Sequence, residues 1–179
     1  FDKEVINMEM LANGSVDGFI MSLSSETQFK NDFNHIREVM DQGIPVVFFD
    51  RVTDEIDCDK VIINDREGAY QAVEKFILSG RRNIALITSE KFLNVSNDRA
   101  EGYFQALNDH GIEVLEKLVL KLPYIDIDEK VVEKFFSQNK IDAVLCVNEV
   151  FAVQCMRLVQ KMGMKVPEDV SFIGFTDGL

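Results

Sequence analysis

The residues best suited to chemistry stand directly after short apolar runs of this sequence. Asn148 follows the run 143–147, and Thr176 and Asp177 follow the run 170–175. Both runs are too unbroken for a half-exposed strand, so they are predicted strands of a parallel sheet covered on both faces. In an open α/β sheet the carboxyl ends of the strands border the ligand crevice, which makes these polar groups candidate binding residues.

Other side chains at similar positions extend this set. Polar residues at further predicted strand ends are Ser22, Asp50, Thr88 and Ser89. Arg99 stands near a predicted helix start, and the loop residues Phe92 and Tyr124 offer flat apolar faces, although Tyr124 could instead fill space in its loop. This mixture suits a polyhydroxyl ligand, because planar polar groups can hold vicinal hydroxyls while a ring stacks on the C–H face of a sugar.

Several of these side chains also have structural explanations. Asp50 and Asn148 could cap helices instead of binding a ligand. Arg99 could pair with Asp98 or Glu101, the carboxylates beside it in the sequence. The pattern alone leaves both explanations open for each residue.

The elements that would position these residues alternate along the chain. Strands are expected at 18–23, 46–49, 61–63, 83–88, 117–122, 143–147 and 170–175. Helices are expected at 2–12, from Phe29 to Gly43, from Asn64 to Gly80, and at 97–110, 128–138 and 149–162. About seven strands and six helices at these spacings favour right-handed βαβ crossovers, and so an α/β fold with parallel sheets flanked by helices.

Composition excludes several classes of protein. The net charge of -12 and the pI of about 4.6 disfavour nucleic-acid binding by this segment itself. No apolar run approaches the roughly 18 residues of a membrane span. Cys58, Cys146 and Cys155 lack metal-site spacing, which favours free thiols in a reducing, cytoplasmic compartment. The chain begins at Phe1 without a leader, so we expect a fragment.

Motifs for catalysis, metals and cofactors are missing from the sequence. Neither a Gly-x-x-x-x-Gly-Lys-Ser/Thr loop nor a Gly-x-Gly-x-x-Gly turn occurs, so nucleotide cofactors lack their phosphate cradle. His35 and His110 fall on the polar faces of expected helices and are interpreted as surface residues. We therefore expect a protein that is not an enzyme and that holds neither a metal nor a cofactor.

Six segments together resemble the effector domain of the lactose-repressor (LacI/GalR) family of bacterial transcriptional regulators. They are Val16-Asp-Gly-Phe-Ile20, Gly43-Ile-Pro-Val-Val-Phe-Phe-Asp-Arg51, Gly80-Arg-Arg-Asn-Ile-Ala-Leu-Ile87, Arg99-Ala-Glu-Gly-Tyr103, Val147-Asn-Glu149 and Val166-Pro-Glu-Asp-Val-Ser-Phe-Ile-Gly-Phe175. Their order and spacing match the family, although each segment alone is a weak signal. Glu149 and Thr176 replace residues that are Asp in the family pattern.

The resemblance implies a periplasmic-binding-protein-like fold of two Rossmann-like lobes with a sugar or related metabolite between them. By motif position it places ligand contacts at Asp50, Arg99, Tyr124, Asn148, Thr176 and Asp177. It also implies that residues 1–62 are a partial amino-terminal lobe and that residues 63–179 are most of the carboxy-terminal lobe.

The resemblance also sets the expected partners. A helix-turn-helix headpiece, absent from this sequence, would bind operator DNA as part of a homodimer, without any membrane partner. The leading hypothesis is thus the ligand-sensing domain of a transcriptional regulator. Its alternatives are a periplasmic sugar-binding protein of a transport system and, from another class, an enzyme such as a sugar-phosphate isomerase.

Overall fold

The computed structural model describes residues 1–90 and 93–175 of the 179-residue chain. The chain forms two compact units. Unit 1 comprises Phe1–Ile63 with Lys91–Val95, and unit 2 comprises Asn64–Glu90 with Ser96–Leu179. Each unit has its own sheet and its own hydrophobic core, and each is considered separately below.

Unit 2 is built on a four-stranded parallel sheet. Its strands are β4 (Ile84–Ser89), β5 (Val119–Leu122), β6 (Ala143–Cys146) and β7 (Ser171–Gly174), in the order β5-β4-β6-β7. Every residue of β4 and of β6 is buried. The expectation that the unbroken runs 143–147 and 170–175 form parallel strands with both faces covered is therefore confirmed for β6, whereas β7 is parallel but only half-buried.

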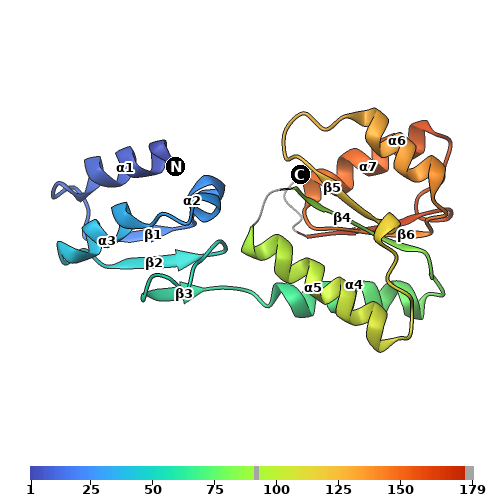
Figure 1. Cartoon of the computed structure of the whole chain (residues 1–179), viewed down its shortest axis with the longest axis horizontal. Helices are drawn as coiled ribbons and strands as arrows, with labels where there is room; N and C mark the ends of the chain where they lie inside the picture. Colours follow the sequence, from blue (N-terminus) through green and yellow to red (C-terminus); the bar gives the residue numbers. More distant parts are fainter. Residues whose placement is uncertain (91–92, 176–179) are drawn as a thin grey trace. The chain divides into compact units, whose positions relative to one another are not determined.

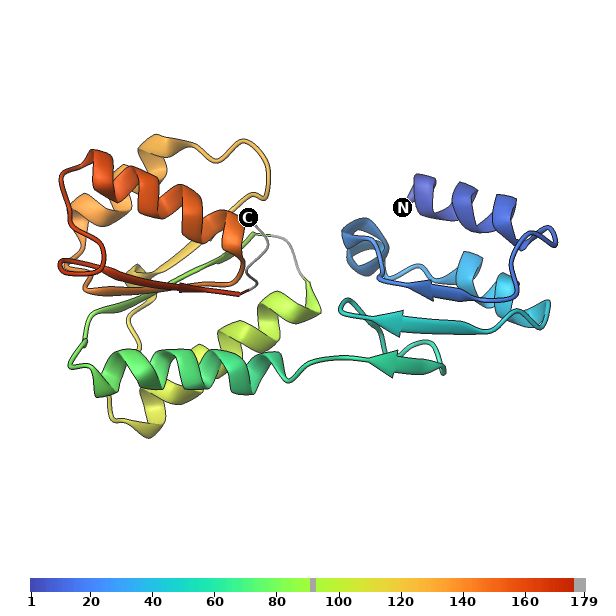
Figure 2. The same cartoon turned by 180° about the vertical axis from the view of Figure 1, so that it is seen from behind.

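Four helices cover the two faces of this sheet. They are α4 (Asp65–Leu78), α5 (Asn94–Asp109), α6 (Glu129–Gln138) and α7 (Glu149–Lys161), and the short 3-10 helix η1 (Glu116–Leu118) precedes β5. Figures 1 and 2 show α4 and α5 on one face of the sheet and α6 and α7 on the other. The order of elements and the parallel pairing confirm the expected α/β architecture.

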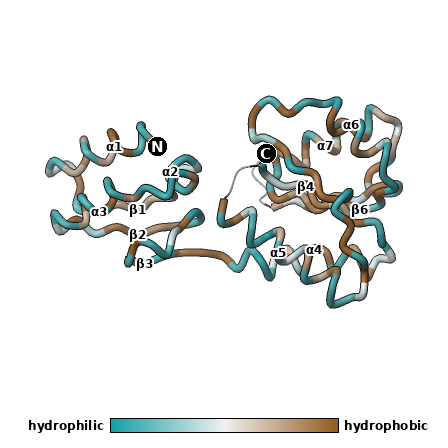
Figure 3. The backbone as a smooth tube through the Cα atoms, viewed as in Figure 1, coloured by the Kyte–Doolittle hydropathy of each residue, from teal (hydrophilic) through white to brown (hydrophobic). Residues whose placement is uncertain are grey.

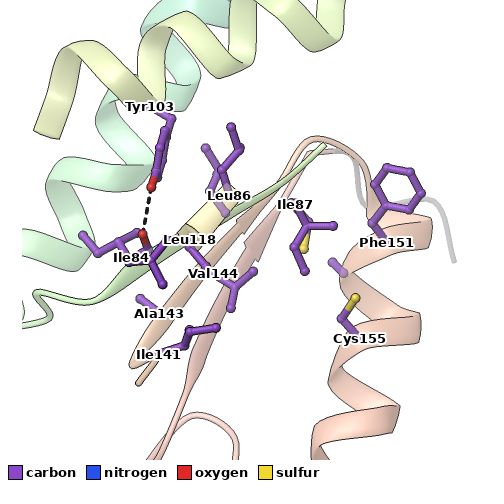
Figure 4. Close-up of a cluster of buried hydrophobic side chains, with 14 of the residues drawn as sticks. Ile84, Leu86, Ile87, Tyr103, Leu118, Ile141, Ala143, Val144, Phe151 and Cys155 are labelled. Carbon is purple, nitrogen blue, oxygen red and sulfur yellow. Dashed lines mark hydrogen bonds between the residues drawn. The ribbon is translucent and has the colours of Figure 1, made fainter. Parts of the chain in front are cut away.

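The core of unit 2 lies between the sheet and these helices. Tyr103 enters from the α5 side, and its hydroxyl donates a 2.8 Å hydrogen bond to the carbonyl oxygen of Ile84 (Figure 4). Phe151 and Cys155 enter from α7, and both are fully buried. Cys146 and Cys155 are free thiols, as expected from their spacing, and burial raises the pKa of Cys155 to about 12.

Unit 1 contains a smaller parallel sheet. Its elements are α1 (Asp2–Ala12), β1 (Phe19–Met21), α2 (Ser25–Lys30), α3 (Asn34–Asp41), β2 (Val46–Phe49) and β3 (Asp59–Val61). The strand order is β1-β2-β3. Met8 of α1 and Ile36 of α3 join Phe48 of the central strand in a buried cluster, so these helices pack on the sheet face that carries Phe48.

The opposite face of the unit 1 sheet is apolar and open. Phe49 pairs with Val61, and Ile20 pairs with Val47, which lies two residues before Phe49 and therefore on the same face. Ile20, Phe49 and Val61 are 79%, 43% and 66% exposed. The apolar character continues into the segment that leaves β3, drawn in brown in Figure 3, where Ile62 and Ile63 are 61% and 66% exposed. Only one face of this parallel sheet is covered by the described residues.

Two expectations for unit 1 are wrong. The helix expected from Phe29 to Gly43 is broken, because Asn31 adopts a left-handed conformation with φ of 52° between α2 and α3, and Phe29 is 69% exposed. His35 was expected on the surface but is 5% exposed. Its Nε2 lies 2.9 Å from a carboxylate oxygen of Glu4, a partner on another helix that compensates for the burial of the ring.

No helix within residues 1–90 and 93–175 is long and apolar enough to cross a membrane.

The predicted cap of α4 is confirmed, since Oδ1 of Asn64 accepts a 3.1 Å hydrogen bond from the amide of Glu67.

Candidate ligand-binding site

The candidate site lies where the strands of the unit 2 sheet end. Because the four strands are parallel, their carboxyl ends meet at one edge. Tyr124 follows β5 there, Asn148 follows β6, and Phe175 follows β7. Thr88 and Ser89 close β4 and are each only 7% exposed. The structure therefore brings Tyr124 and Asn148, two of the sequence-predicted residues, to the same edge.

Asn148 has both a structural role and an unused donor. Its Oδ1 accepts a 2.8 Å hydrogen bond from the amide of Phe151 and thereby caps α7. Its Nδ2 is buried and has no hydrogen-bond partner among the described residues. A buried amide donor without a partner is unfavourable by about 1–3 kcal/mol, so this position favours a bound group that supplies an acceptor oxygen.

Arg99 of α5, a helix on the sheet face that α4 also covers, reaches the same edge at the carbonyl oxygen of Val147. Its Nε donates a 2.6 Å hydrogen bond to Oδ1 of Asp65, and its Nη1 donates to the carbonyl oxygen of Val147 at 2.5 Å. The ring of Phe175 covers the guanidinium, with 3.9 Å between Cζ and the ring centroid. Arg99 is 9% exposed, and Nη2 makes no hydrogen bond to any residue that the structure describes.

A close helix contact places Asp65 within reach of Arg99. A Cβ atom added at Gly102 of α5 would lie 2.9 Å from Cβ of Ala69 and closer still to the carbonyl oxygen of Arg66. The glycine therefore lets α5 pack directly against the first turns of α4. This contact explains in physical terms why a glycine stands three residues after Arg99.

The aromatic part of the site rests on α7. The ring of Tyr124 stacks on the ring of Phe151, with centroids 5.3 Å apart and an interplanar angle of 28°. The Tyr124 hydroxyl lies 3.4 Å from Oγ of Ser96, and Tyr124 remains 38% exposed. An exposed ring held in a fixed orientation, on the same sheet edge as unused N–H donors, can bind a ligand that has both an apolar face and acceptor oxygens.

Negative charge gathers around Arg99. Desolvation by burial, followed by the charges of Asp65 and Glu101, raises the pKa of Asp98 above its usual value. Arg66, the other nearby cation, forms a 3.4 Å ion pair with Glu101. The cations named here are thus each paired with a carboxylate, and Asp98 adds a further acidic group.

Asp50 belongs to unit 1 and directly follows β2. It is exposed, has a φ of 58°, and its amide donates a 3.2 Å hydrogen bond to the carbonyl oxygen of Val61. The next residue, Arg51, donates from its side chain to the carbonyl oxygen of Leu23, and its amide lies 3.4 Å from Oγ of Ser22. The ends of β1 and β2 in unit 1 are therefore tied together, and Asp50 lies in that turn.

Two predicted site residues, Thr176 and Asp177, lie outside the described residues, as does Phe92. Among the described residues, no group of three or more His, Cys, Asp or Glu side chains is arranged to hold a metal ion.

Comparison with known proteins decides the family. The sequence profile for periplasmic binding proteins and the sugar binding domain of the LacI family matches residues 2–179. The chain belongs to this family. The resemblance inferred from the six short segments is thereby confirmed, and so is the periplasmic-binding-protein-like fold class.

The relatives include transcriptional repressors and solved transcriptional regulators. The probable HTH-type transcriptional repressor ExuR of Bacillus subtilis is 35% identical over 164 residues, which are 90% of this chain and 48% of that repressor. The solved complex of the transcriptional regulator CelR with cellobiose is 26% identical, with a TM-score of 0.80 over 97% of this chain and 53% of CelR. A sugar-binding LacI-family regulator of Escherichia coli, solved with phosphate, is 25% identical, with a TM-score of 0.78 over 98% of this chain and 63% of that one. The chain spans about half the length of the repressor it matches.

Sequence reasoning missed part of this candidate site. The carboxylates proposed as partners of Arg99 were Asp98 and Glu101, but the structure pairs Arg99 with Asp65, which lies 34 residues away in sequence. Phe175 was seen only as part of a family motif, and its packing on Arg99 was not expected. The capping pattern at Asn64 drew attention to the start of α4 but carried no signal for a long-range ion pair.

Proposed function

We propose that this chain is the ligand-sensing domain of a LacI-type transcriptional regulator. Its effector, a sugar or related small metabolite, binds at the carboxyl edge of the unit 2 sheet. The regulator works in the cytoplasm as a homodimer and binds operator DNA through a helix-turn-helix headpiece outside these 179 residues. In this proposal unit 1 is part of the amino-terminal lobe, and unit 2 is most of the carboxy-terminal lobe.

The unpartnered Nδ2 of Asn148 carries the proposal for the site. This buried donor belongs to the residue that follows Val147, whose carbonyl oxygen accepts a hydrogen bond from Nη1 of Arg99, and the exposed ring of Tyr124 lies on the same edge. Nδ2 of Asn148, Nη2 of Arg99 and a flat apolar surface match the hydroxyl oxygens and the C–H face of a sugar ring. Asp50, Thr176 and Asp177 are proposed as further contacts on the strength of their motif positions.

The regulatory step follows from linkage. An effector shifts DNA affinity only if it binds the DNA-competent and DNA-incompetent states with different affinities. A coupling free energy of about 1–3 kcal/mol, typical of allosteric proteins, would change operator affinity by roughly 5- to 150-fold. Family membership and the repressor relatives support a regulator, rather than a transport protein or an enzyme, as the context for this coupling.

The first experiment is a thermal-shift screen of the polypeptide against a panel of ligands. One solved relative holds cellobiose and another holds phosphate, so the panel contains neutral sugars and sugar phosphates. A ligand at about 100 times its dissociation constant adds roughly 2.7 kcal/mol to the stability of the native state, which is a readable shift. No shift with any ligand, in a chain shown to be folded, would refute the proposed site.

A pair of matched variants locates the binding site. Asn148→Ser keeps an oxygen that can cap α7 but removes the Nδ2 donor, so the ligand-induced shift should fall sharply. Asn139→Ser makes the same change before β6, where Nδ2 of Asn139 bonds to the carbonyl oxygen of Phe135, and should leave the shift intact. An equal decrease of the ligand-induced thermal shift in both variants would contradict a binding site at the carboxyl edge.

DNA binding is tested on the longer polypeptide that carries the proposed headpiece. Fluorescence anisotropy with DNA from upstream of its own gene should show an affinity that changes at least fivefold when the ligand from the screen is added. An unchanged affinity would separate ligand binding from transcriptional control.

A further inference from the structure

The positive charge of Arg99 is already compensated inside the protein. The Nε of Arg99 and Oδ1 of Asp65 are 2.6 Å apart, and the two residues are 9% and 6% exposed. A buried pair of this kind is only weakly screened by solvent. The guanidinium therefore presents N–H donors to a ligand while the pair as a whole is close to neutral.

An approaching anion would meet both members of this pair. A phosphate oxygen that accepts a hydrogen bond from Nη2 of Arg99 would also lie near the carboxylate of Asp65, because the two side chains are in contact. Repulsion from the carboxylate then offsets part of the attraction to the guanidinium. A hydroxyl oxygen loses little from the same arrangement, since it needs a donor and not a net charge.

The surrounding side chains do not restore a positive field. Arg66 is engaged by Glu101 at 3.4 Å, and Asp98 adds an acidic group beside Arg99 in the sequence. The whole chain carries a formal charge of -12, which adds a general repulsion for anions. Both the local charges and the overall charge of the chain therefore disfavour an anionic ligand and favour an uncharged one.

We propose that Asp65 is a specificity-determining residue that makes this edge of unit 2 select uncharged polyhydroxyl compounds over their phosphorylated or carboxylated forms. This inference rests on the proposed function, because it assigns a ligand class to the same site. Asp65 acts through Arg99: it orients the guanidinium and compensates its charge without contacting the ligand.

The test compares matched ligand pairs and inorganic phosphate by isothermal titration calorimetry at low ionic strength. The pairs are ribose with ribose 5-phosphate, glucose with glucose 6-phosphate, and glucose with glucuronate. For any pair that binds, the wild-type chain should prefer the neutral member by about tenfold or more, and inorganic phosphate should bind negligibly. A wild-type chain that binds the anionic member equally well or better overturns the proposal, and this comparison requires no variant.

The matched variants are Asp65→Asn and Asp98→Asn. Asp65→Asn keeps an oxygen that can accept from Nε of Arg99 but removes the charge, so affinity for inorganic phosphate should rise by about tenfold or more and should weaken again with added salt. Asp98→Asn also removes one negative charge but leaves the ion pair between Arg99 and Asp65 intact. The phosphate affinity of this variant should therefore stay within about threefold of the wild type. An equal gain in both variants would indicate a general field effect and would overturn the role of Asp65.

The outcomes separate this inference from the proposed function. If no sugar binds but Asp65→Asn gains phosphate affinity, the sensor proposal fails and the charge role of Asp65 stands. If neutral sugars and their phosphates bind the wild type alike, the sensor proposal stands and the selectivity proposal fails. A folded Asp65→Asn variant that gains no affinity for phosphate also overturns the selectivity proposal.

Discussion

The two units use the same kind of sheet and complete it to different extents. In unit 2, helices cover both faces, and β4 and β6 are buried along their whole length. In unit 1, the face of β2 that carries Phe48 is buried, whereas Phe49 and its neighbours Ile20 and Val61 are exposed on the other face. A parallel sheet is normally covered on both sides, so unit 2 satisfies this requirement within the described residues and unit 1 does not.

This difference has an energetic meaning. Apolar burial contributes roughly 25 cal/mol per Å² removed from water, and a sheet with one bare face forgoes that contribution on half of its side chains. Unit 2 should therefore hold most of the stability of the chain, and the proposed ligand edge lies on this more stable unit. Binding sites on rigid elements keep their geometry better than sites on weakly held ones.

Native-state hydrogen exchange should show the largest contrast between the units. Leu145 in β6 and Phe48 in β2 are a matched pair, because both are fully buried in strands that have neighbours on both sides. We expect the Leu145 amide to exchange more slowly by a factor on the order of 10³, since local opening free energies range from near zero up to the global value. Equal protection of the two amides, measured by NMR or mass spectrometry, would mean that the units unfold together and do not differ in stability.

Core truncation in unit 2 should have the next largest effect. Phe151→Ala removes a fully buried ring that also supports Tyr124, so the free energy of unfolding should fall by about 3–5 kcal/mol. Phe29→Ala in unit 1 deletes a ring that is 69% exposed. It should change the free energy of unfolding by less than about 0.5 kcal/mol. Urea unfolding monitored by circular dichroism measures both, and a large loss in Phe29→Ala would show that this ring is buried in solution.

The features that could be predicted from the sequence are those that short segments encode. The unbroken run 143–147 predicted β6, and Asn64 predicted the start of α4, because strand burial and helix capping depend on neighbouring residues. The positions of Tyr124 and Asn148 at one edge followed from strand order, since parallel strands place their carboxyl ends together.

The features that were missed depend on partners far away in sequence. Glu4 lies 31 residues from His35 and makes its burial acceptable, while Asp65 lies 34 residues from Arg99. Neither pairing leaves a trace in local periodicity. The helix predicted from Phe29 was wrong for a related reason. The spacing of Phe29 to the apolar residues after it suits one face of a helix, but it carries no information about the left-handed turn at Asn31.

Removing the carboxylate of Glu4 should destabilise unit 1 by an intermediate amount. Its two oxygens accept hydrogen bonds from the amide of Ser24 and the hydroxyl of Thr27, both at 2.6 Å, and lie near Nε2 of His35. Glu4→Ala leaves these buried and half-buried groups without their acceptor, so we expect the free energy of unfolding to fall by about 2–3 kcal/mol. Glu9→Ala on the same helix, where the side chain is exposed, should change stability by less than about 0.5 kcal/mol. Similar losses in both variants would point to helix propensity rather than to the hydrogen bonds.

The smallest effect should come from Asp98→Asn, which is expected to stabilise unit 2. Burial, and then the charges of Asp65 and Glu101, raise the pKa of Asp98 above 3.8, so its ionised form is less favourable in the folded state than in the unfolded state. The wild-type penalty is complete above the raised folded pKa and disappears as pH falls through it to below 3.8, where both states are protonated. The variant should therefore gain up to about 1 kcal/mol at pH 7, the usual range for a partly exposed charge, and this gain should shrink steadily as the pH approaches 3.8. Urea unfolding of both proteins across this range measures the difference, and a gain that stays constant with pH would show that packing, rather than ionisation of Asp98, sets it.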